Sequence, residues 1–119
     1  MRNISFSLTK EQILAGAKTV TRRNGWRHAQ PGQLLQGAEK CQGLKRGEKI
    51  KRLRVVRLLD VRFEPLRRML DDPEYGREEC RLEGFPDKTP EEFVQMYCKA
   101  NSCTADQEIT RLQFEYVNE

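Results

Sequence analysis

The segment 16–23, GAKTVTRR, gathers residue types that could bind an anionic ligand or react with one. Thr21 and Arg23 are two positions apart, so a regular β-strand would point both side chains to the same face. Lys18 is three positions before Thr21 and joins them only if it lies in the turn after Gly16, before regular pairing begins. On that condition, the spacing predicts that an ammonium group, a hydroxyl and a guanidinium group meet at the rim of one pocket.

In such a pocket the threonine hydroxyl could act as a nucleophile. A threonine is a weak nucleophile unless a neighbouring base accepts its proton. Lysine can be that base when burial or nearby cations lower its pKa toward neutrality, and Arg22 and Arg23 could supply the repulsion. The alternative is structural, with Thr21 as a β-branched strand residue and Lys18 as a solvated residue of a turn.

The formal net charge of +4 hides an uneven distribution along the chain. Residues 1–68 hold 17 Lys or Arg against 5 Asp or Glu, whereas residues 69–119 hold 5 against 13. This asymmetry predicts a basic face built by the first half and an acidic cover built by the second. A basic face attracts phosphates, which makes nucleic acid a candidate partner, although alternating arginines could equally serve only to solvate an exposed sheet.

The length of 119 residues, with 37% hydrophobic residues, predicts a single folded domain over residues 1–119. The four cysteines form only one close pair, Cys98 and Cys103, and His28 is the single histidine, so we expect no metal site and no cofactor. The first residues lack the apolar run of a signal peptide, and no segment is long enough to cross a membrane. We therefore expect a cytoplasmic protein with free thiols and no membrane partner, present as a monomer or weak dimer.

Hydrophobic patterns of both strand and helix type predict an α+β domain. Thr9 with Gln12, and Thr89 with Glu92, have the spacing of capping boxes at helix starts. We expect about five or six strands in a curled sheet or small β-barrel, flanked by two or three helices. The expected strands are 3–7, 18–23, 34–39, a long strand that ends at Pro65, and 107–117; the expected helices are 9–16, 72–84 and 89–101.

The long strand before Pro65 is the most regular segment of the sequence. One parity is apolar and is expected to face the core, and the other parity carries arginines that are expected to face water. A strand of this length commonly bends or bulges to serve two parts of a barrel. The apolar set is Leu53, Val55, Leu59, Val61 and Phe63, and the arginines are Arg52, Arg54 and Arg62.

The segment ILAGAKTVTRR, residues 13–23, resembles the signature of the ASCH domain family, a branch of the PUA-like small β-barrels. The turn PGQLL, the long strand, EGF at 83–85 and the helix start TPEEF follow in the family's order, so the similarity touches nearly the whole chain. Gln33 departs from the pattern, since many relatives carry an acid after Pro-Gly. The signature G-x-K-x-x-T-x-R falls on Gly16, Lys18, Thr21 and Arg23.

The resemblance implies a pseudobarrel with a cleft beside the first helix, and a role in RNA binding or RNA-nucleoside processing. Some members are amidohydrolases that remove an acetyl group from the exocyclic amine of cytidine. Their proposed catalytic set, carried over by the motif, is Lys18, Thr21 and the downstream Glu83. Other relatives are ribonucleases or binding modules, so a domain that binds RNA or a nucleotide, an amidohydrolase and a ribonuclease all stay open.

A second set of residues is a candidate for contacts with RNA. Trp26, beside cations, could stack an unpaired base, although a single tryptophan more often packs on the end of a barrel. The segment GLKRGEK could be a phosphate-contacting hairpin tip or only a soluble turn. The full candidate nucleic-acid-binding set is Arg22, Arg23, Trp26, Arg27, Lys45, Arg46, Arg52 and Arg54.

Overall fold

The computed structural model describes residues 1–41 and 45–118, and within them it contains five strands and four helices. The α+β class predicted from the sequence is confirmed. The fourth helix is a single turn, α2, that no periodic pattern indicated. In chain order the elements are β1 (Arg2–Ser5), α1 (Lys10–Leu14), β2 (Val20–Arg23), β3 (Leu34–Ala38), β4 (Arg52–Pro65), α2 (Arg68–Asp71), α3 (Pro73–Leu82), α4 (Pro90–Asn101) and β5 (Glu108–Tyr116).

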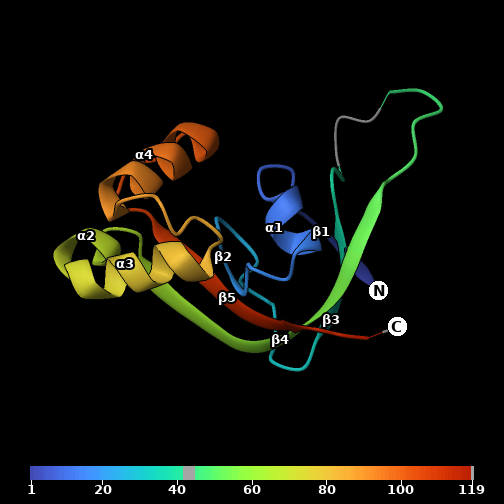
Figure 1. Cartoon of the computed structure of the whole chain (residues 1–119), viewed down its shortest axis with the longest axis horizontal. Helices are drawn as coiled ribbons and strands as arrows, with labels where there is room; N and C mark the ends of the chain where they lie inside the picture. Colours follow the sequence, from blue (N-terminus) through green and yellow to red (C-terminus); the bar gives the residue numbers. More distant parts are fainter. Residues whose placement is uncertain (42–44, 119) are drawn as a thin grey trace.

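The strands form one curled sheet in the order β1-β3-β4-β5-β2. β1 pairs with β3 in parallel, and the other neighbours are antiparallel. β1 and β2 are therefore the two edges, and the sheet is a half-barrel rather than a closed barrel over the described residues. Figure 1 shows α1 between these edge strands, and α2, α3 and α4 gathered at the far end of β4 and β5.

β4 carries an irregularity that reverses its faces. Its register against β5 shifts between Leu58 and Asp60, as the length of the strand led us to expect. The predicted parity is wrong before this point, where Val56 and Leu58 fill the core from the parity that was expected to face water. The shift moves the core-facing side to the other parity, so that Val61 packs against the core beyond it. Leu59, at the shift, is 46% exposed, and Phe63 is 47% exposed, so neither fills the core as predicted.

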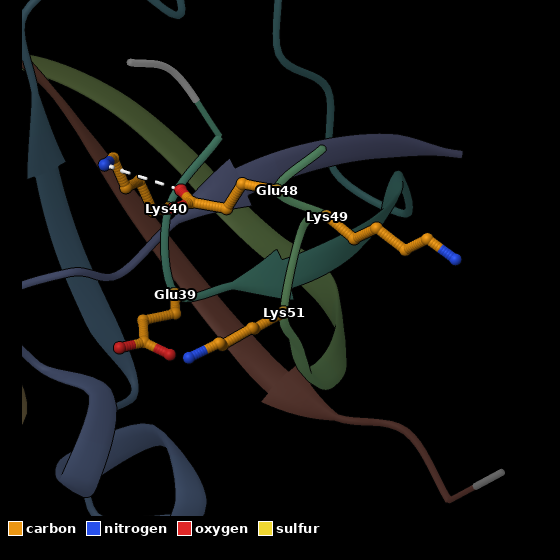
Figure 2. Close-up of a pocket in the computed structure, with 5 residues that line it drawn as sticks. All are labelled: Glu39, Lys40, Glu48, Lys49 and Lys51. Carbon is orange, nitrogen blue, oxygen red and sulfur yellow. Dashed lines mark ion pairs between the residues drawn. The ribbon is translucent and has the colours of Figure 1, made fainter. Parts of the chain in front are cut away.

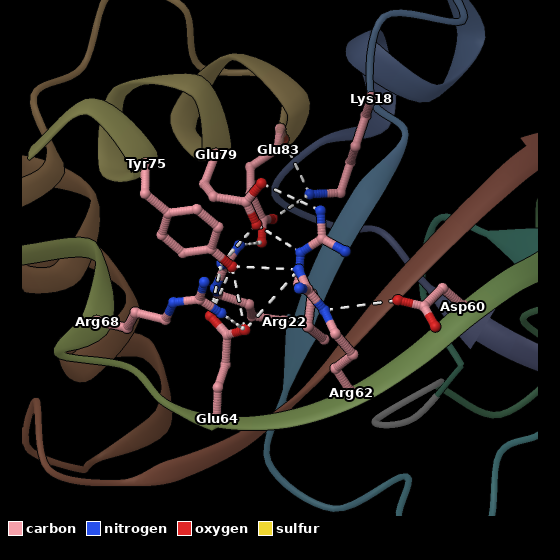
Figure 3. A network of polar contacts seen from close by, with 10 residues as sticks. Lys18, Arg22, Asp60, Arg62, Glu64, Arg68, Tyr75, Glu79 and Glu83 are labelled. Carbon is pink, nitrogen blue, oxygen red and sulfur yellow. Dashed lines mark hydrogen bonds and ion pairs between the residues drawn. The ribbon is translucent and has the colours of Figure 1, made fainter. Parts of the chain in front are cut away.

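Two hydrophobic clusters stabilise the two ends of the molecule. One lies inside the curled sheet around Phe6, Val56 and Phe114, and the other lies between α2, α3, α4 and β5 around Met69 and Phe93. The polar residues of the site described below come from β2, β4, β5 and α3, so they lie where the sheet meets the helices (Figure 3).

The helix ends differ in how well the sequence predicted them. Thr89 and Glu92 form the predicted capping box at α4, with Glu92 N donating to Thr89 Oγ1 at 3.1 Å and Thr89 N donating to Glu92 Oε1 at 2.9 Å. The predicted box at α1 is wrong, since Thr9 makes no side-chain cap. Gln12 instead donates to the carbonyl of Gly84 at 3.2 Å, which ties α1 to the end of α3.

Thr89→Ala should reduce the free energy of unfolding by about 1 kcal/mol, because it removes the side-chain acceptor for an unpaired N–H at the start of α4. Urea unfolding followed by circular dichroism measures the change. Thr104→Ala, at an exposed loop position, is the matched control and should leave the midpoint unchanged. An equal loss in both variants would contradict a role for the cap.

Candidate active site

A cavity of about 220 Å³ lies beside α1, between the two edge strands of the sheet and the helices α3 and α4. Its walls come from the segment after β1, from β2 and the residue Lys18 before it, from the end of α3, and from the last turns of α4. Lys18, Thr21, Arg23 and Glu83 all line it, so the structure brings the predicted motif residues and the glutamate to one place.

Lys18 lies in the turn that follows α1, where Gly16 has a φ of +72° that favours glycine. The lysine is buried, and its Nζ donates to Glu83 Oε1 at 2.7 Å and to the Glu83 carbonyl at 2.9 Å. Burial lowers the pKa of Lys18, the Glu83 carboxylate opposes this, and the charges of Arg23 and Arg22 add to the lowering. The ammonium group therefore holds its proton less tightly than a lysine in water.

Glu83 is held in place by the backbone at the end of α3. The next residue, Gly84, has a φ of +94°, and a Cβ there would lie 2.8 Å from Gln12 Cγ. Only glycine fits this turn comfortably, and the turn directs the buried Glu83 carboxylate toward Lys18. Its second oxygen accepts from Arg22 Nη1 at 3.1 Å, so both oxygens are occupied by cations.

Thr21 and Arg23 share one face of β2, as their spacing predicted. Thr21 is buried, and its Oγ1 accepts from Arg23 Nε at 3.1 Å; Arg23 Nη2 also donates to the carbonyl of Ser5 across the gap between the edge strands. Over residues 1–41 and 45–118, no hydrogen bond joins Thr21 directly to Lys18 or Glu83. The hydroxyl lines the cavity, and within those same ranges it donates to no protein acceptor.

Arg22 is the centre of a buried ion-pair network (Figure 3). Its guanidinium group donates to Glu79 at 2.6 Å, to Glu83 at 3.1 Å and to Glu64 at 3.3 Å, and its side chain is fully buried. Arg22 was a candidate for contact with RNA, but it is enclosed by carboxylates and so cannot reach a phosphate on the surface. Its position assigns it to the support of Glu83.

Sequence reasoning missed the other members of this network. Glu79 also binds Arg111, whose Nε lies 2.5 Å from Glu79 Oε1, and Tyr75 donates its hydroxyl to Glu64 at 2.8 Å. Burial and the bond to Glu64 raise the pKa of Tyr75 to about 12, so it stays a donor. The buried charges balance, with Lys18, Arg22 and Arg111 against Glu64, Glu79 and Glu83.

The remaining candidates for RNA contact come from several segments of the chain. Arg27 pairs with Glu108 at 2.7 Å, and the guanidinium of Arg54 lies 4.1 Å from the ring centre of Tyr116. Trp26 packs against the sheet core and is half-buried. Lys45, Arg46 and Arg52 are exposed near the segment GLKRGEK, whose first two residues lie outside the described part of the chain.

A second hollow of about 240 Å³ lies near the end of β3, and Glu48 and Lys49 of that segment help to line it (Figure 2). Both signs of charge line it, and Lys40 Nζ lies 3.7 Å from Glu48 Oε1 across an exposed pair. It contains no nucleophile beside a base, so it is a poor candidate for catalysis. Its lining residues are Glu39, Lys40, Glu48, Lys49 and Lys51.

No helix in the described ranges is long and apolar enough to cross a membrane. Within the same ranges, no three His, Cys, Asp or Glu residues lie close enough together to hold a metal ion. All four cysteines are free thiols.

No family model matches the sequence, and no curated protein is similar to it at a significant level. Solved structures do match. The structure of protein EF3133 from Enterococcus faecalis V583, of family DUF984, aligns at a TM-score of 0.62 and 16% identity, covering 98% of this chain and 79% of that one. The hypothetical protein PH0355 aligns at 0.62 and 19% identity, covering 98% and 96%. An ASCH domain from Lactobacillus crispatus JV V101 aligns at 0.57 and 14% identity, covering 97% and 78%.

The fold is that of an ASCH domain. The resemblance drawn from segment 13–23 is thus confirmed at the level of the fold, including its PUA-like half-barrel and the cleft beside the first helix. Identities of 14% to 19% carry the fold alone, because one fold can host several activities. What this ASCH fold does has to be argued from its cavity.

Proposed function

We propose that this chain is an amide hydrolase that removes an acyl group from the exocyclic amine of a cytidine-type nucleoside. The observation that carries the proposal is the buried pair of Lys18 and Glu83, 2.7 Å apart on the wall of the cavity that Thr21 also lines. A base, an acid and a hydroxyl nucleophile are the groups that acyl transfer requires. The choice of an acylated cytidine rests on the resemblance of the motif to ASCH amidohydrolases.

The buried pair can hold its proton in two ways. Lys18 and Glu83 can be an ammonium and a carboxylate, or an amine and a carboxylic acid, with the same number of protons in both forms. Burial penalises the charged form, and this lowers the pKa of Lys18. The neutral form provides the base and the acid that the reaction needs, so transfer of one proton from Lys18 to Glu83 prepares the site.

From the neutral form, Thr21 Oγ1 attacks the acyl carbon while its proton passes to Lys18 Nζ. Since Oγ1 already accepts from Arg23, its own proton is directed away from that cation. Within the described residues, Thr21 and Lys18 are not in direct hydrogen-bond contact. That contact would form when the substrate binds, or one water molecule would bridge the two groups, as is common for catalytic hydrogen bonds.

Collapse of the intermediate breaks the carbon–nitrogen bond. Glu83 gives its proton to the departing amine, which leaves an acyl ester on Thr21. A water molecule then gives a proton to the Glu83 carboxylate and attacks the ester, while Lys18 returns a proton to Thr21 Oγ1. The products are the free amine and a carboxylic acid, and all three side chains regain their starting protonation states.

Plain RNA binding is less well supported by the geometry. Among its candidate residues, Arg23 and Trp26 line one hollow together. The others are divided between a buried network, paired surface positions and an exposed loop, as Arg22, Arg27 and Lys45 illustrate. An RNA-binding module usually presents cations and aromatic faces together along one groove. The cavity around Lys18, in contrast, unites several candidate groups in one hollow.

A mass-spectrometric screen tests the proposal. Purified protein is incubated with a panel of nucleosides acylated on the base, and a mock purification without the protein is the control. We expect release of free cytidine and the carboxylic acid from the acylated cytidine. If no member of the panel loses its acyl group while RNA oligomers bind in a salt-dependent manner, the hydrolase is excluded and the binding function replaces it.

A further inference from the structure

A larger hollow of about 660 Å³ adjoins the cavity of the candidate active site. The two share Ser5, Ser7 and Arg23 in their walls, so the guanidinium of Arg23 stands at the boundary between them. One side of this boundary holds Lys18 and Glu83; the other side holds the residues on and after β1 and β3 together with Trp26. A ligand that fills the first cavity can therefore continue into the second.

The charge of the adjoining hollow is of one sign. Its charged lining residues are Arg2, Arg23 and Lys40, and the rest of its lining is neutral. Lys40 forms an ion pair with Glu48 at 3.7 Å, but both side chains are exposed. Because solvent screens such a pair, the lysine can still bind an anionic ligand. Three cations around one concave surface favour an anionic group.

The wall formed by Trp26 is fixed before any ligand arrives. Trp26 has a φ of +55°, which is uncommon for a bulky residue, and the residues before it are tied to the body of the protein. Tyr97 donates to Asn24 Oδ1 at 2.7 Å, and Thr110 donates to the carbonyl of Gly25. Arg2 lies over the indole ring at 3.9 Å from its centre, so the ring presents this cation to the hollow.

We propose that this hollow, lined by Arg2, Lys40 and Trp26, binds the phosphate of a nucleoside phosphate whose base lies in the cavity of Lys18 and Glu83. The inference rests on the proposed function for the position of the base. A nucleotide carries its phosphate on the ribose, on the side away from the reacting amine. With the amine at Glu83, the ribose would pass Arg23 and the phosphate would meet the cations beyond it.

The test measures binding, so that it does not depend on catalysis. Isothermal titration compares cytidine with cytidine monophosphate, and wild-type protein should bind the monophosphate at least about tenfold more tightly, as charge-assisted hydrogen bonds allow. The double variant Arg2→Gln/Lys40→Gln should lose this preference and keep its affinity for cytidine. Both positions are solvent-exposed, and circular dichroism checks that each variant is folded. If the double variant does not fold, Lys40→Gln alone replaces it and should lose part of the preference for the monophosphate.

A matched control removes the same amount of charge elsewhere. Arg77→Gln/Lys99→Gln, at exposed positions of α3 and α4, should keep the preference for the phosphate. Equal loss in both double variants would show attraction by net charge alone and would overturn the proposed site. Equal binding of cytidine and its monophosphate by the wild type would overturn it as well.

The outcomes also separate this inference from the proposed function. A preference for phosphate that depends on Arg2 and Lys40, without hydrolysis of any acylated nucleoside, would support the phosphate site and remove the hydrolase. Hydrolysis that is equally efficient with and without the phosphate would support the hydrolase and overturn the phosphate site. A short cytidine oligomer is the third probe: tighter binding than the monophosphate, lost in Arg2→Gln/Lys40→Gln, would assign the phosphate to a strand of RNA.

Discussion

Glu79→Ala should destabilise the fold by about 3–5 kcal/mol, because it leaves two buried guanidinium groups without their shared carboxylate. Glu79 accepts from Arg22 at 2.6 Å and from Arg111 at 2.5 Å and 3.1 Å, and it is 2% exposed. Neither arginine can lose its proton, so each would remain charged in a site with little water. Urea unfolding at neutral pH measures the loss.

The pH dependence adds a second readout for Glu79. Burial alone would raise the pKa of this carboxyl group, but the hydrogen bonds and charges of Arg111 and Arg22 outweigh burial and hold it below its ordinary value of 4.5. A carboxyl group with a lowered pKa in the folded state stabilises the fold above its ordinary pKa, and this contribution is lost as the pH falls through the lowered value. The difference between wild type and Glu79→Ala should therefore shrink in acid.

The neighbouring glutamate provides the control. Glu78 pairs with Arg81 on the exposed face of α3, so Glu78→Ala removes a carboxylate from the same turn of the same helix without uncovering a buried charge. Its unfolding midpoint should stay close to that of the wild type. If Glu79→Ala proved no more harmful than Glu78→Ala, the network around Arg22 would not be a structural element of this fold.

The sequence predicted the elements of the fold better than their registers. Thr89 caps the start of α4 and Gly84 ends the turn after α3, and both roles can be predicted from the neighbouring residues in the sequence. The bulge after Leu58 depends on how β4 meets β5, which no neighbour of Leu58 reveals. For this reason the predicted parity of the long strand failed on both sides of the shift, since Val56 and Leu58 before it are buried and Phe63 after it is exposed.

In the candidate site, too, short-range features were predictable from the sequence and long-range contacts were not. The alternation of β2 placed Thr21 beside Arg23, and the turn after Gly16 allowed Lys18 to join them; these are short-range arguments. The partners of Arg22 come from 42 and 57 residues away, and spacing cannot predict contacts at that range. The one available signal was the uneven charge of the chain, since acidic residues from α3 do meet cations from the first half, although inside the protein rather than on its surface.

Lys18→Met should reduce the rate of amide hydrolysis by about 10²–10⁴-fold, since it removes the base that accepts the proton of Thr21 and keeps a chain of similar length. The arrangement of the cavity should survive, because Glu83 retains Arg22 at 3.1 Å. Thr21→Val, which keeps the shape and removes the hydroxyl, should abolish the reaction. Single-turnover rates of acetylcytidine hydrolysis measure both effects.

Controls with the same chemistry lie outside the cavity. Lys10→Met removes a half-buried lysine from α1, and Thr19→Val removes a hydroxyl one residue before β2; neither side chain lines the cavity, and neither change should alter the rate. Retention of most activity by Lys18→Met, with the protein folded, would assign the proton to another acceptor.

The pH profile of the wild type distinguishes a base from a merely structural lysine. The proposed mechanism needs one proton on the pair of Lys18 and Glu83, so the rate should fall as the pH rises through the pKa of Lys18 and the pair loses that proton. Burial, with help from Arg23 and Arg22, lowers that pKa below the ordinary value of 10.5, and this moves the fall in rate toward neutral pH. Lys18→Met should have a low rate without this fall. A variant that keeps the fall at a lower rate would identify Lys18 as a positioning residue for Glu83 instead.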